Sequence, residues 1–407
     1  MSDSGRHAPR KPIDETNASY QLSLKRKKAK ALEREQLKKV DEQLDLITAE
    51  ELLETTYYFE NNYRRVQPYY YNFKVNAKGR WVGKSIVEVF VSEFKVCDVN
   101  GTELAIQRGD ITVNDLPTTL SYKVRMGDHI GHRVHRHEPP VTSQEVKIIK
   151  ETQDFIVVDK PGSIPVHPCG RYRHNTVVFI MASLGLKTLR PVHRLDRMTS
   201  GILILAKSAD AARRVGEKIC SKQTAKVYLI RVRGKMSEMV TVEGKIGRQS
   251  KKEKIDVMVQ HIDEEKGKAS KSQFEPLFYD EKSNTTVITG KLESGRTHQL
   301  RVHLKEIGHP VANDPIYGAK FDSTKHCDDD GIIESEYKGD LKKWEKVDWC
   351  DECNKIKGDP EQLEIYLHAW KYEIDGEKFE TDVPWWAKRE ADVTKELEKW
   401  KANHILE

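Results

Sequence analysis

The stretch HRLDRMTSGILILAK, residues 193–207, places one carboxylate, Asp196, between charged side chains and a Thr-Ser-Gly turn that leads into an apolar run. Asp, Ser and Gly all favour turns for local backbone reasons, so Asp196 could be a turn residue only. A carboxylate can also act as a nucleophile that splits one difficult reaction into two easier steps. The sequence therefore allows a structural and a catalytic interpretation of Asp196.

A catalytic carboxylate needs a cation beside it, because burial in a pocket opposes its ionisation. The segment GRTHQLR supplies two candidates, Arg296 and Arg301. Taken alone, these arginines indicate salt bridges on a strand surface. Tyr228 in AKVYLI, taken alone, indicates a core aromatic in a strand.

Cys350 and Cys353 in WCDECNK have the spacing of metal ligands, and His326 or Cys327 could contribute a third ligand. One Cys-x-x-Cys pair is only half of a site. The alternative is an ordinary surface loop with two reduced thiols. Any zinc held there would be structural, and no other metal site is expected.

The six cysteines are scattered over a chain with no secretory apolar segment, which favours reduced thiols inside the cell. We expect a cytoplasmic protein, with the nucleus or the mitochondrion as alternatives. No apolar run approaches the roughly 20 residues that a membrane span needs. We therefore expect no membrane association.

The net charge of +5 is unevenly distributed, since KRKKAKALEREQLKK, residues 25–39, holds eight basic and two acidic residues. Such a segment attracts phosphates or carries a localisation signal, unless it is simply a solvated helix. It belongs to an extension, residues 1–55, that we expect to be disordered to about residue 20 and helical over residues 22–54.

A small module is expected over residues 56–140. It begins with aromatic residues interleaved with Arg and Lys, a composition suited to base stacking or to a core. A helix is expected from Lys84, followed from Ile106 by short hairpins with Gly-Asp and Asn-Asp turns. The module resembles a small RNA-binding module first seen in a ribosomal protein.

Strands dominate the rest of the chain. GILILAK, AKVYLIRVRG, TTVITGKLE and HQLRVHL each alternate apolar residues or form apolar runs between turns. A helix is expected after Ser208, which is a plausible N-cap. This order predicts a strand-rich α+β domain rather than regular βαβ repeats.

Four ordered stretches together resemble the RluA-type pseudouridine synthases: VVDKPGSIPVHP, HRLDRMTSGILILAK, AKVYLI and ESGRTHQLRVHLKEIGHPVANDPIYG. The resemblance implies a catalytic domain over residues 146–390 with a mixed, largely antiparallel sheet. An acidic, cysteine-containing insertion around residues 320–362 departs from the family pattern. Residues 391–407 would form a C-terminal helix or tail.

The resemblance also assigns roles to the candidate residues. Asp196 would be the catalytic carboxylate and Arg301 its cationic partner. Tyr228 would stack on the target base and take part in moving the proton at carbon 5.

Three further residues would contact RNA by the same resemblance. Arg194 would enter the RNA when the target nucleotide is extruded. His193 would help to fix the loop without transferring protons. Arg296 would order its loop or hold a phosphate.

The implied reaction converts uridine to pseudouridine in RNA and is isomeric, so it needs no cofactor and no nucleotide. The eukaryotic enzymes that act on tRNA at position 32 are the most similar members, which makes tRNA the expected partner. The alternatives are an rRNA pseudouridine synthase and a non-catalytic RNA-binding or assembly factor with the same fold. A zinc deaminase is excluded because the chain contains no His-x-Glu motif. The sequence does not indicate an oligomeric state.

Overall fold

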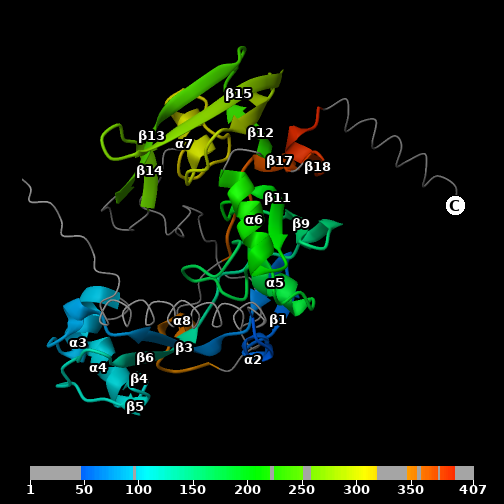
Figure 1. The fold of residues 1–407 in the computed structure, drawn as a ribbon. Coiled ribbons are helices and arrows are strands. Elements are labelled where there is room, and N and C mark those ends of the chain that lie inside the picture. The colour runs from blue at the N-terminus through cyan, green and yellow to red at the C-terminus, as the bar shows by residue number, and fades with distance from the viewer. Residues whose placement is uncertain are drawn as a thin grey trace, which may run out of the picture. The chain divides into compact units, whose positions relative to one another are not determined.

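The computed structural model describes residues 47–94, 98–220, 224–250, 258–318, 346–354, 359–374 and 376–389 (Figure 1). The basic segment 25–39 and the C-terminal tail 391–407 lie outside the described residues, as do His326 and Cys327. The helix expected over residues 22–54 does not continue unbroken to Glu54, because Ile47 and Thr48 are not helical and a short helix, α2, spans Ala49–Leu53. It begins at Thr48, whose side chain accepts a hydrogen bond from the Glu51 amide while Glu51 accepts one from the Thr48 amide, a capping box.

The module near residues 56–140 contains two small sheets and several short helices. The three-stranded sheet has the order β1 (Tyr57–Glu60), β2 (Tyr63–Val66), β7 (Val141–Thr142), and the four-stranded sheet the order β3 (Tyr69–Asn76), β6 (His129–Arg136), β4 (Ile111–Val113), β5 (Leu116–Pro117). The helical elements are η1 (Gly79–Trp81), α3 (Ile86–Val89), η2 (Phe90–Phe94) and α4 (Val99–Gln107).

The module has its own apolar core, in which Trp81, Ile86 and Ile111 are almost completely buried. Its Asn-Asp turn joins β4 to β5, and both Asn114 and Asp115 have positive φ angles, 55° and 63°. Two successive residues in this region give the turn the backbone twist that matches paired strands.

The larger part of the chain is built on an eleven-stranded sheet, with the order β14-β13-β15-β16-β12-β17-β11-β9-β8 and with β10 and β18 paired at its side. The strands are β8 (Lys147–Glu151), β9 (Phe155–Lys160), β10 (Arg190–Pro191), β11 (Ser200–Ala206), β12 (Thr224–Arg233), β13 (Val240–Ser250), β14 (Met258–Ile262), β15 (Lys268–Asp280), β16 (Thr285–Leu292), β17 (Leu367–Ile374) and β18 (Glu377–Glu380). Among these pairs β11 and β17 run parallel and the others antiparallel. The expected α+β class with a mixed, largely antiparallel sheet is confirmed.

The remaining helices are α5 (Val177–Ser183), α6 (Ala209–Cys220), α7 (Gln299–Glu306), α8 (Asp351–Asn354) and η3 (Trp385–Ala387). The Ser208 hydroxyl accepts a hydrogen bond from the Ala211 amide at 3.1 Å, so the expected N-cap of α6 is confirmed. In the described part of the chain, no helix is long and apolar enough to cross a membrane.

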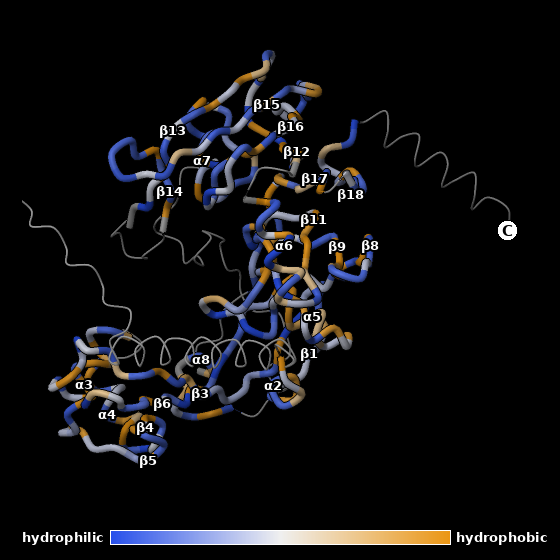
Figure 2. Tube along the Cα trace, viewed as in Figure 1, coloured by the Kyte–Doolittle hydropathy of each residue, from blue (hydrophilic) through white to orange (hydrophobic). Residues whose placement is uncertain are grey.

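Strand β11 is apolar along its whole length because both of its faces are covered. Leu203 and Leu205 pack in one core cluster, and Ile202 and Ile204 pack in another. Strand β11 appears as a hydrophobic stretch in Figure 2. A strand buried on both faces is a continuous apolar run rather than an alternating one, which is how GILILA differs from its neighbours.

The prediction of a strand for HQLRVHL is wrong, because this segment forms helix α7. Leu300, Val302 and Leu304 alternate as in a strand, but Leu300 and Leu304 are also four residues apart and share the same core cluster. All six residues from Gln299 to Leu304 are buried, so neither a period of 2 nor one of 3.6 stands out.

Candidate active site

A cleft of about 560 Å³ lies beside the loop that precedes β11. It is bounded by the loop containing Asp196, by β12, and by the turn that leads from β16 into α7. Its lining residues include His193, Arg194, Asp196, Lys226, Tyr228, Arg296, His298 and Arg301. The structure thus brings together all six residues for which the sequence predicted catalytic or RNA-binding roles.

The carboxylate of Asp196 is partly accessible, with 18% of its side chain exposed. Its loop is closed by a hydrogen bond from the Thr199 amide to the Asp196 carbonyl at 3.1 Å. The next residue is also held, because the Ser200 hydroxyl lies 2.8 Å from Nδ1 of the buried His368. Gly201 then enters the sheet with φ of 108°, where a Cβ would lie 2.3 Å from the Ala369 carbonyl oxygen. Asp196 therefore has both roles: its backbone carbonyl closes the turn 196–199, and its side chain lines the cleft.

A buried lysine, Lys160, supports the loop that contains Asp196. The Lys160 side chain is fully buried, and its Nζ donates hydrogen bonds to the carbonyl oxygens of Pro161, Ile164 and Arg197 at 2.8, 2.9 and 3.1 Å. A buried ammonium is tolerated only when its donors are satisfied, as here. The bond to Arg197, the residue directly after Asp196, fixes the backbone that carries the carboxylate. The sequence offers Lys160 only within the DKPG turn, and its role was not foreseen.

Arg301, on α7, is the cation nearest to Asp196 in the described structure. Its guanidinium is fully buried and forms a two-pronged pair with Asp314, with Nε at 2.6 Å from one carboxylate oxygen and Nη2 at 3.0 Å from the other. Its Nη1 lies 3.7 Å from the Asp196 carboxylate and makes no hydrogen bond with the described residues. Burial alone would lower the pKa of Arg301, but attraction to Asp314 raises it above its ordinary value. Arg301 is thus a permanent positive charge aimed at the cleft.

A histidine not foreseen from the sequence also faces the carboxylate. His298 has φ of 54° at the start of α7, and its Nε2 lies 3.9 Å from Asp196. The other ring nitrogen, Nδ1, is 2.9 Å from the hydroxyl of Tyr317, whose ring also lies under the guanidinium of Arg301. The left-handed backbone turns the imidazole toward the cleft, and this conformation cannot be inferred from a histidine in a helix-like sequence.

Tyr228 lies on β12 opposite Gly290 and Ala369, and its side chain is 8% exposed. Burial is the main cause that raises the pKa of its phenol, with smaller contributions from Tyr372 and Asp196. The phenol is therefore protonated at neutral pH. It offers a flat aromatic face and a hydroxyl donor to whatever occupies the cleft.

The predicted RNA-contacting residues occupy different environments. Arg194 is exposed at the cleft, and Arg296 is exposed with its Nε donating to the Ala269 carbonyl at 3.1 Å. His193 accepts a hydrogen bond from the Ile204 amide at 3.2 Å and stacks on Tyr372. Burial lowers the pKa of His193 to about 3, so the imidazole is neutral and its contacts are those of a loop-fixing residue.

Lys226 is a further cleft residue that the sequence did not single out. It lies on β12 two residues before Tyr228, and its Nζ is 5.0 Å from the centre of the Tyr372 ring. Burial lowers its pKa to about 8. Because this pKa is close to neutral pH, small changes in the surroundings alter the protonation of Lys226.

Comparison with known proteins identifies the family of this chain. Residues 154–306 match the family described as RNA pseudouridylate synthase. The mitochondrial tRNA pseudouridine(32) synthase of Saccharomyces cerevisiae is 35% identical over 360 residues, which cover 80% of this chain and 77% of the relative. This chain belongs to the RNA pseudouridylate synthase family.

Other RNA pseudouridylate synthases show how far the likeness extends. The tRNA pseudouridine(31) synthase of Saccharomyces cerevisiae is 33% identical over 396 residues, covering 81% of this chain and 96% of the relative. Pseudouridylate synthase RPUSD2 of Homo sapiens is 44% identical over 273 residues, covering 66% of this chain and 49% of the relative. The chain thus spans about half the length of RPUSD2. Human RNA Pseudouridylate Synthase Domain Containing 1, a solved structure, is 22% identical with a TM-score of 0.42 and covers 62% of this chain and 95% of its own.

The RNA pseudouridylate synthase match contains the cleft residues Asp196, Tyr228 and Arg301 but ends before the cysteine pair. Cys350 and Cys353 are not among the residues that line the cleft. They lie instead beside two histidines of the small module, His135 and His137.

Proposed function

We propose that this protein converts uridine to pseudouridine in RNA, with Asp196 as the catalytic carboxylate. The observation that carries the proposal is the position of Asp196 in the cleft, 3.7 Å from a buried arginine that Asp314 keeps charged. The cation lies beside the carboxylate without holding it in a close bidentate pair. The exposed fraction of Asp196 leaves it accessible to a ligand.

In this reaction the bond from N1 of uracil to C1′ of ribose breaks, and a bond from C5 to C1′ forms. C5 loses its proton and N1 gains one, so the reaction is balanced without an oxidant, a reductant or a cofactor. The Asp196 carboxylate would attack either C1′ of the sugar or C6 of the ring, and both routes convert one hard step into two easier ones.

The other cleft residues would hold the target nucleotide. Tyr228 provides a stacking face for the uracil ring, and its raised pKa makes the phenol a hydrogen-bond donor rather than a base. Arg194, exposed beside the Asp196 loop, would occupy the space left when the nucleotide is extruded from the RNA. Arg296 and Lys226 would contact phosphate groups at the rim.

We propose tRNA as the substrate, with uridine 32 of the anticodon loop as the target. Two yeast relatives that this chain spans over most of their length are named tRNA pseudouridine synthases, for positions 32 and 31. A loop nucleotide is also less costly to extrude than one in a helix.

The test uses tRNA transcripts that carry tritium at C5 of uridine. We expect tritium release that approaches one equivalent per tRNA and disappears when uridine 32 is replaced by cytidine. Release that persists in this transcript but disappears when uridine 31 is replaced would reassign the position. Absence of release from every tRNA and rRNA, together with tight RNA binding, would contradict the enzymatic function and favour a non-catalytic RNA-binding factor.

A further inference from the structure

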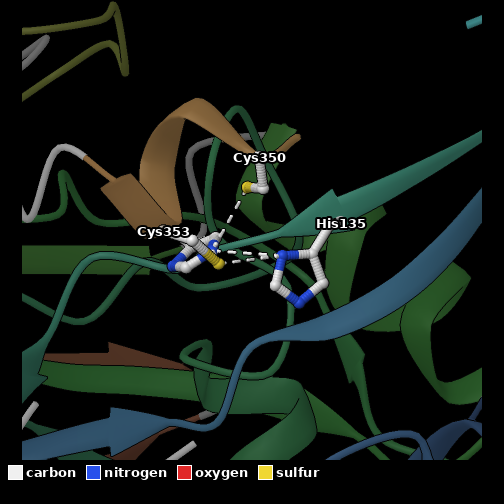
Figure 3. A group of neighbouring side chains, drawn as sticks. His135, Cys350 and Cys353 are labelled. Carbon is white, nitrogen blue, oxygen red and sulfur yellow. Dashed lines mark hydrogen bonds between the residues drawn. The ribbon is translucent and has the colours of Figure 1, made fainter. Parts of the chain in front are cut away.

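A second group of chemically reactive side chains lies away from the cleft residues. His135 on β6, His137 just after it, and Cys350 and Cys353 around α8 each direct one ligand atom to a common point. These four atoms all lie within 4.8 Å of one another. Figure 3 shows the two cysteines on the α8 segment and His135 on the neighbouring strand, with their sulfur and nitrogen atoms converging.

Four of the six distances between the ligand atoms fit a tetrahedral zinc site. Cys353 Sγ lies 3.3 Å from His137 Nε2 and 3.5 Å from His135 Nδ1, and Cys350 Sγ lies 3.6 Å from His137 Nε2. The two ring nitrogens are 3.3 Å apart. With Zn–S bonds of about 2.3 Å and Zn–N bonds of about 2.0–2.1 Å, tetrahedral geometry places S and N about 3.5 Å apart and two N atoms about 3.3 Å apart.

The local backbone is arranged around the sulfurs. Both cysteines are buried, 6% and 1% exposed, and both are free thiols. The Cys353 amide donates to the Cys350 carbonyl at 3.1 Å, and the Val347 amide lies 3.5 Å from Cys353 Sγ. A backbone N–H directed at a sulfur stabilises its thiolate form, which is a common outer-shell feature of metal sites.

We propose that His135, His137, Cys350 and Cys353 bind one Zn²⁺ ion. Two thiolates and two imidazoles form a donor set that zinc prefers, whereas Mg²⁺ and Ca²⁺ prefer oxygen ligands. Four protein ligands fill a tetrahedral shell and leave no position for water or substrate. The site is therefore structural.

This ligand set differs from the one that the sequence suggested. The sequence suggested the cysteine pair with His326 or Cys327 as a third ligand, and both of these lie outside the described residues. The structure instead supplies two histidines more than 200 residues earlier in the chain, with separations of 213 and 218 residues between the paired ligands. All four ligands lie outside the segment that matches the family, residues 154–306.

The ion would fasten the inserted segment to the small module. Next to the ligands, Trp349 lies 6.4 Å from both His135 and Tyr70 and stacks under the guanidinium of Arg108 at 4.2 Å. A metal bond between segments more than 200 residues apart in the chain would add stability to this packing.

The first experiment measures the metal content of the full-length protein, purified under reducing conditions without chelator, by inductively coupled plasma mass spectrometry. We expect about one zinc per chain, and X-ray absorption at the zinc edge with two sulfur and two nitrogen neighbours. The cobalt-substituted protein should show the intense visible and near-ultraviolet absorption of thiolate-bound Co²⁺ in a tetrahedral site. None of these readouts depends on enzymatic activity.

Matched serine variants locate the ligands. Cys350→Ser and Cys353→Ser should each reduce zinc content at least about tenfold after dialysis against a weak chelator, because loss of a thiolate ligand removes much of the affinity. Cys169→Ser, which changes an exposed cysteine, and Cys327→Ser should retain the full zinc content.

Three results would overturn the proposal, and the first needs no variant to fold. The first is wild-type protein that stays free of zinc after incubation with zinc sulfate and reductant. The second is a Cys350–Cys353 disulfide in protein alkylated before reduction. The third is loss of zinc from Cys327→Ser with full retention of zinc in Cys350→Ser.

Discussion

At the scale of single residues, the cleft depends on how Arg301 divides its donors. Nε and Nη2 are committed to the buried Asp314, and Nη1 is left near Asp196. A guanidinium can serve two carboxylates in this way because its donors are fixed in a planar fork. Asp314 is therefore a positioning residue, and its own pKa is lowered by Arg301 although burial alone would raise it.

Arg301→Lys tests this division. Lysine keeps the positive charge but cannot pair with Asp314 through two nitrogens and still face Asp196, so we expect kcat to fall about 100-fold. The free energy of unfolding should fall by about 3 kcal/mol, because the buried pair is weakened. Single-turnover tritium release and denaturant unfolding measure the two effects. Arg213→Lys, an exposed position on α6, is the control, and an unchanged kcat in Arg301→Lys would contradict the assignment.

Lys226 should make RNA binding depend on pH. Its pKa of about 8 in the folded protein lies below the ordinary 10.5, so its charge disappears as the pH rises from 7 to 9. We expect the affinity for tRNA to fall by up to about tenfold over this range, since the attraction to one phosphate weakens. Lys226→Arg should remove this dependence, as measured by fluorescence anisotropy.

The same shift has a defined sign for stability. The unfolded chain keeps the Lys226 proton up to about pH 10.5, whereas the folded chain releases it near pH 8. The contribution of Lys226 to the free energy of unfolding therefore rises between these two values and is constant below pH 8. A contribution that falls over this range would contradict the burial of Lys226.

At the scale of elements, the Asp196 loop is held between β9 and β11 by the buried Lys160. We expect Lys160→Met to lower the free energy of unfolding by about 3 kcal/mol, because three carbonyl acceptors lose their donor. It should also lower kcat more than it raises KM, because the backbone next to Asp196 is released. Lys207→Met, whose ammonium pairs with Glu151 at a more exposed position, should change neither by much. Equal effects of the two substitutions would refute the positioning role.

The elements themselves were predictable to different degrees. GILILAK and AKVYLIRVRG were correctly predicted as strands, because their β-branched residues and the turns that bound them favour strands. HQLRVHL was assigned to the wrong class because burial on all sides erased its period. His298 has a positive φ, and Lys160 is buried. Both features depend on contacts with distant segments, so the local sequence does not predict them.

At the scale of the whole molecule, both sites are assembled from segments that are far apart in sequence. Asp196 and Arg301 were predicted to meet only through a family resemblance, which carries long-range information that composition and spacing lack. The partners of Cys350 and Cys353 lie outside the part of the chain that matches the family, so no sequence pattern pointed to His135 and His137.

The distribution of charge predicts how the protein binds RNA as salt concentration changes. We expect the logarithm of the tRNA association constant to fall linearly and steeply with the logarithm of salt concentration, because bound phosphates release their counterions. Deletion of residues 1–45, which include the basic segment 25–39, should weaken binding and reduce the slope by about 0.7 to 0.9 for each phosphate that the basic segment neutralises. Unaltered affinity and slope would show that this segment takes no part in RNA binding.

The most direct test of the central claim compares wild-type protein with Asp196→Asn on the same tritium-labelled tRNA. The amide preserves the size of the side chain but cannot act as a carboxylate nucleophile. We expect tritium release to fall by at least about 1,000-fold, with the Kd for tRNA and the unfolding midpoint nearly unchanged. An Asp196→Asn protein that releases tritium at the wild-type rate would contradict the account.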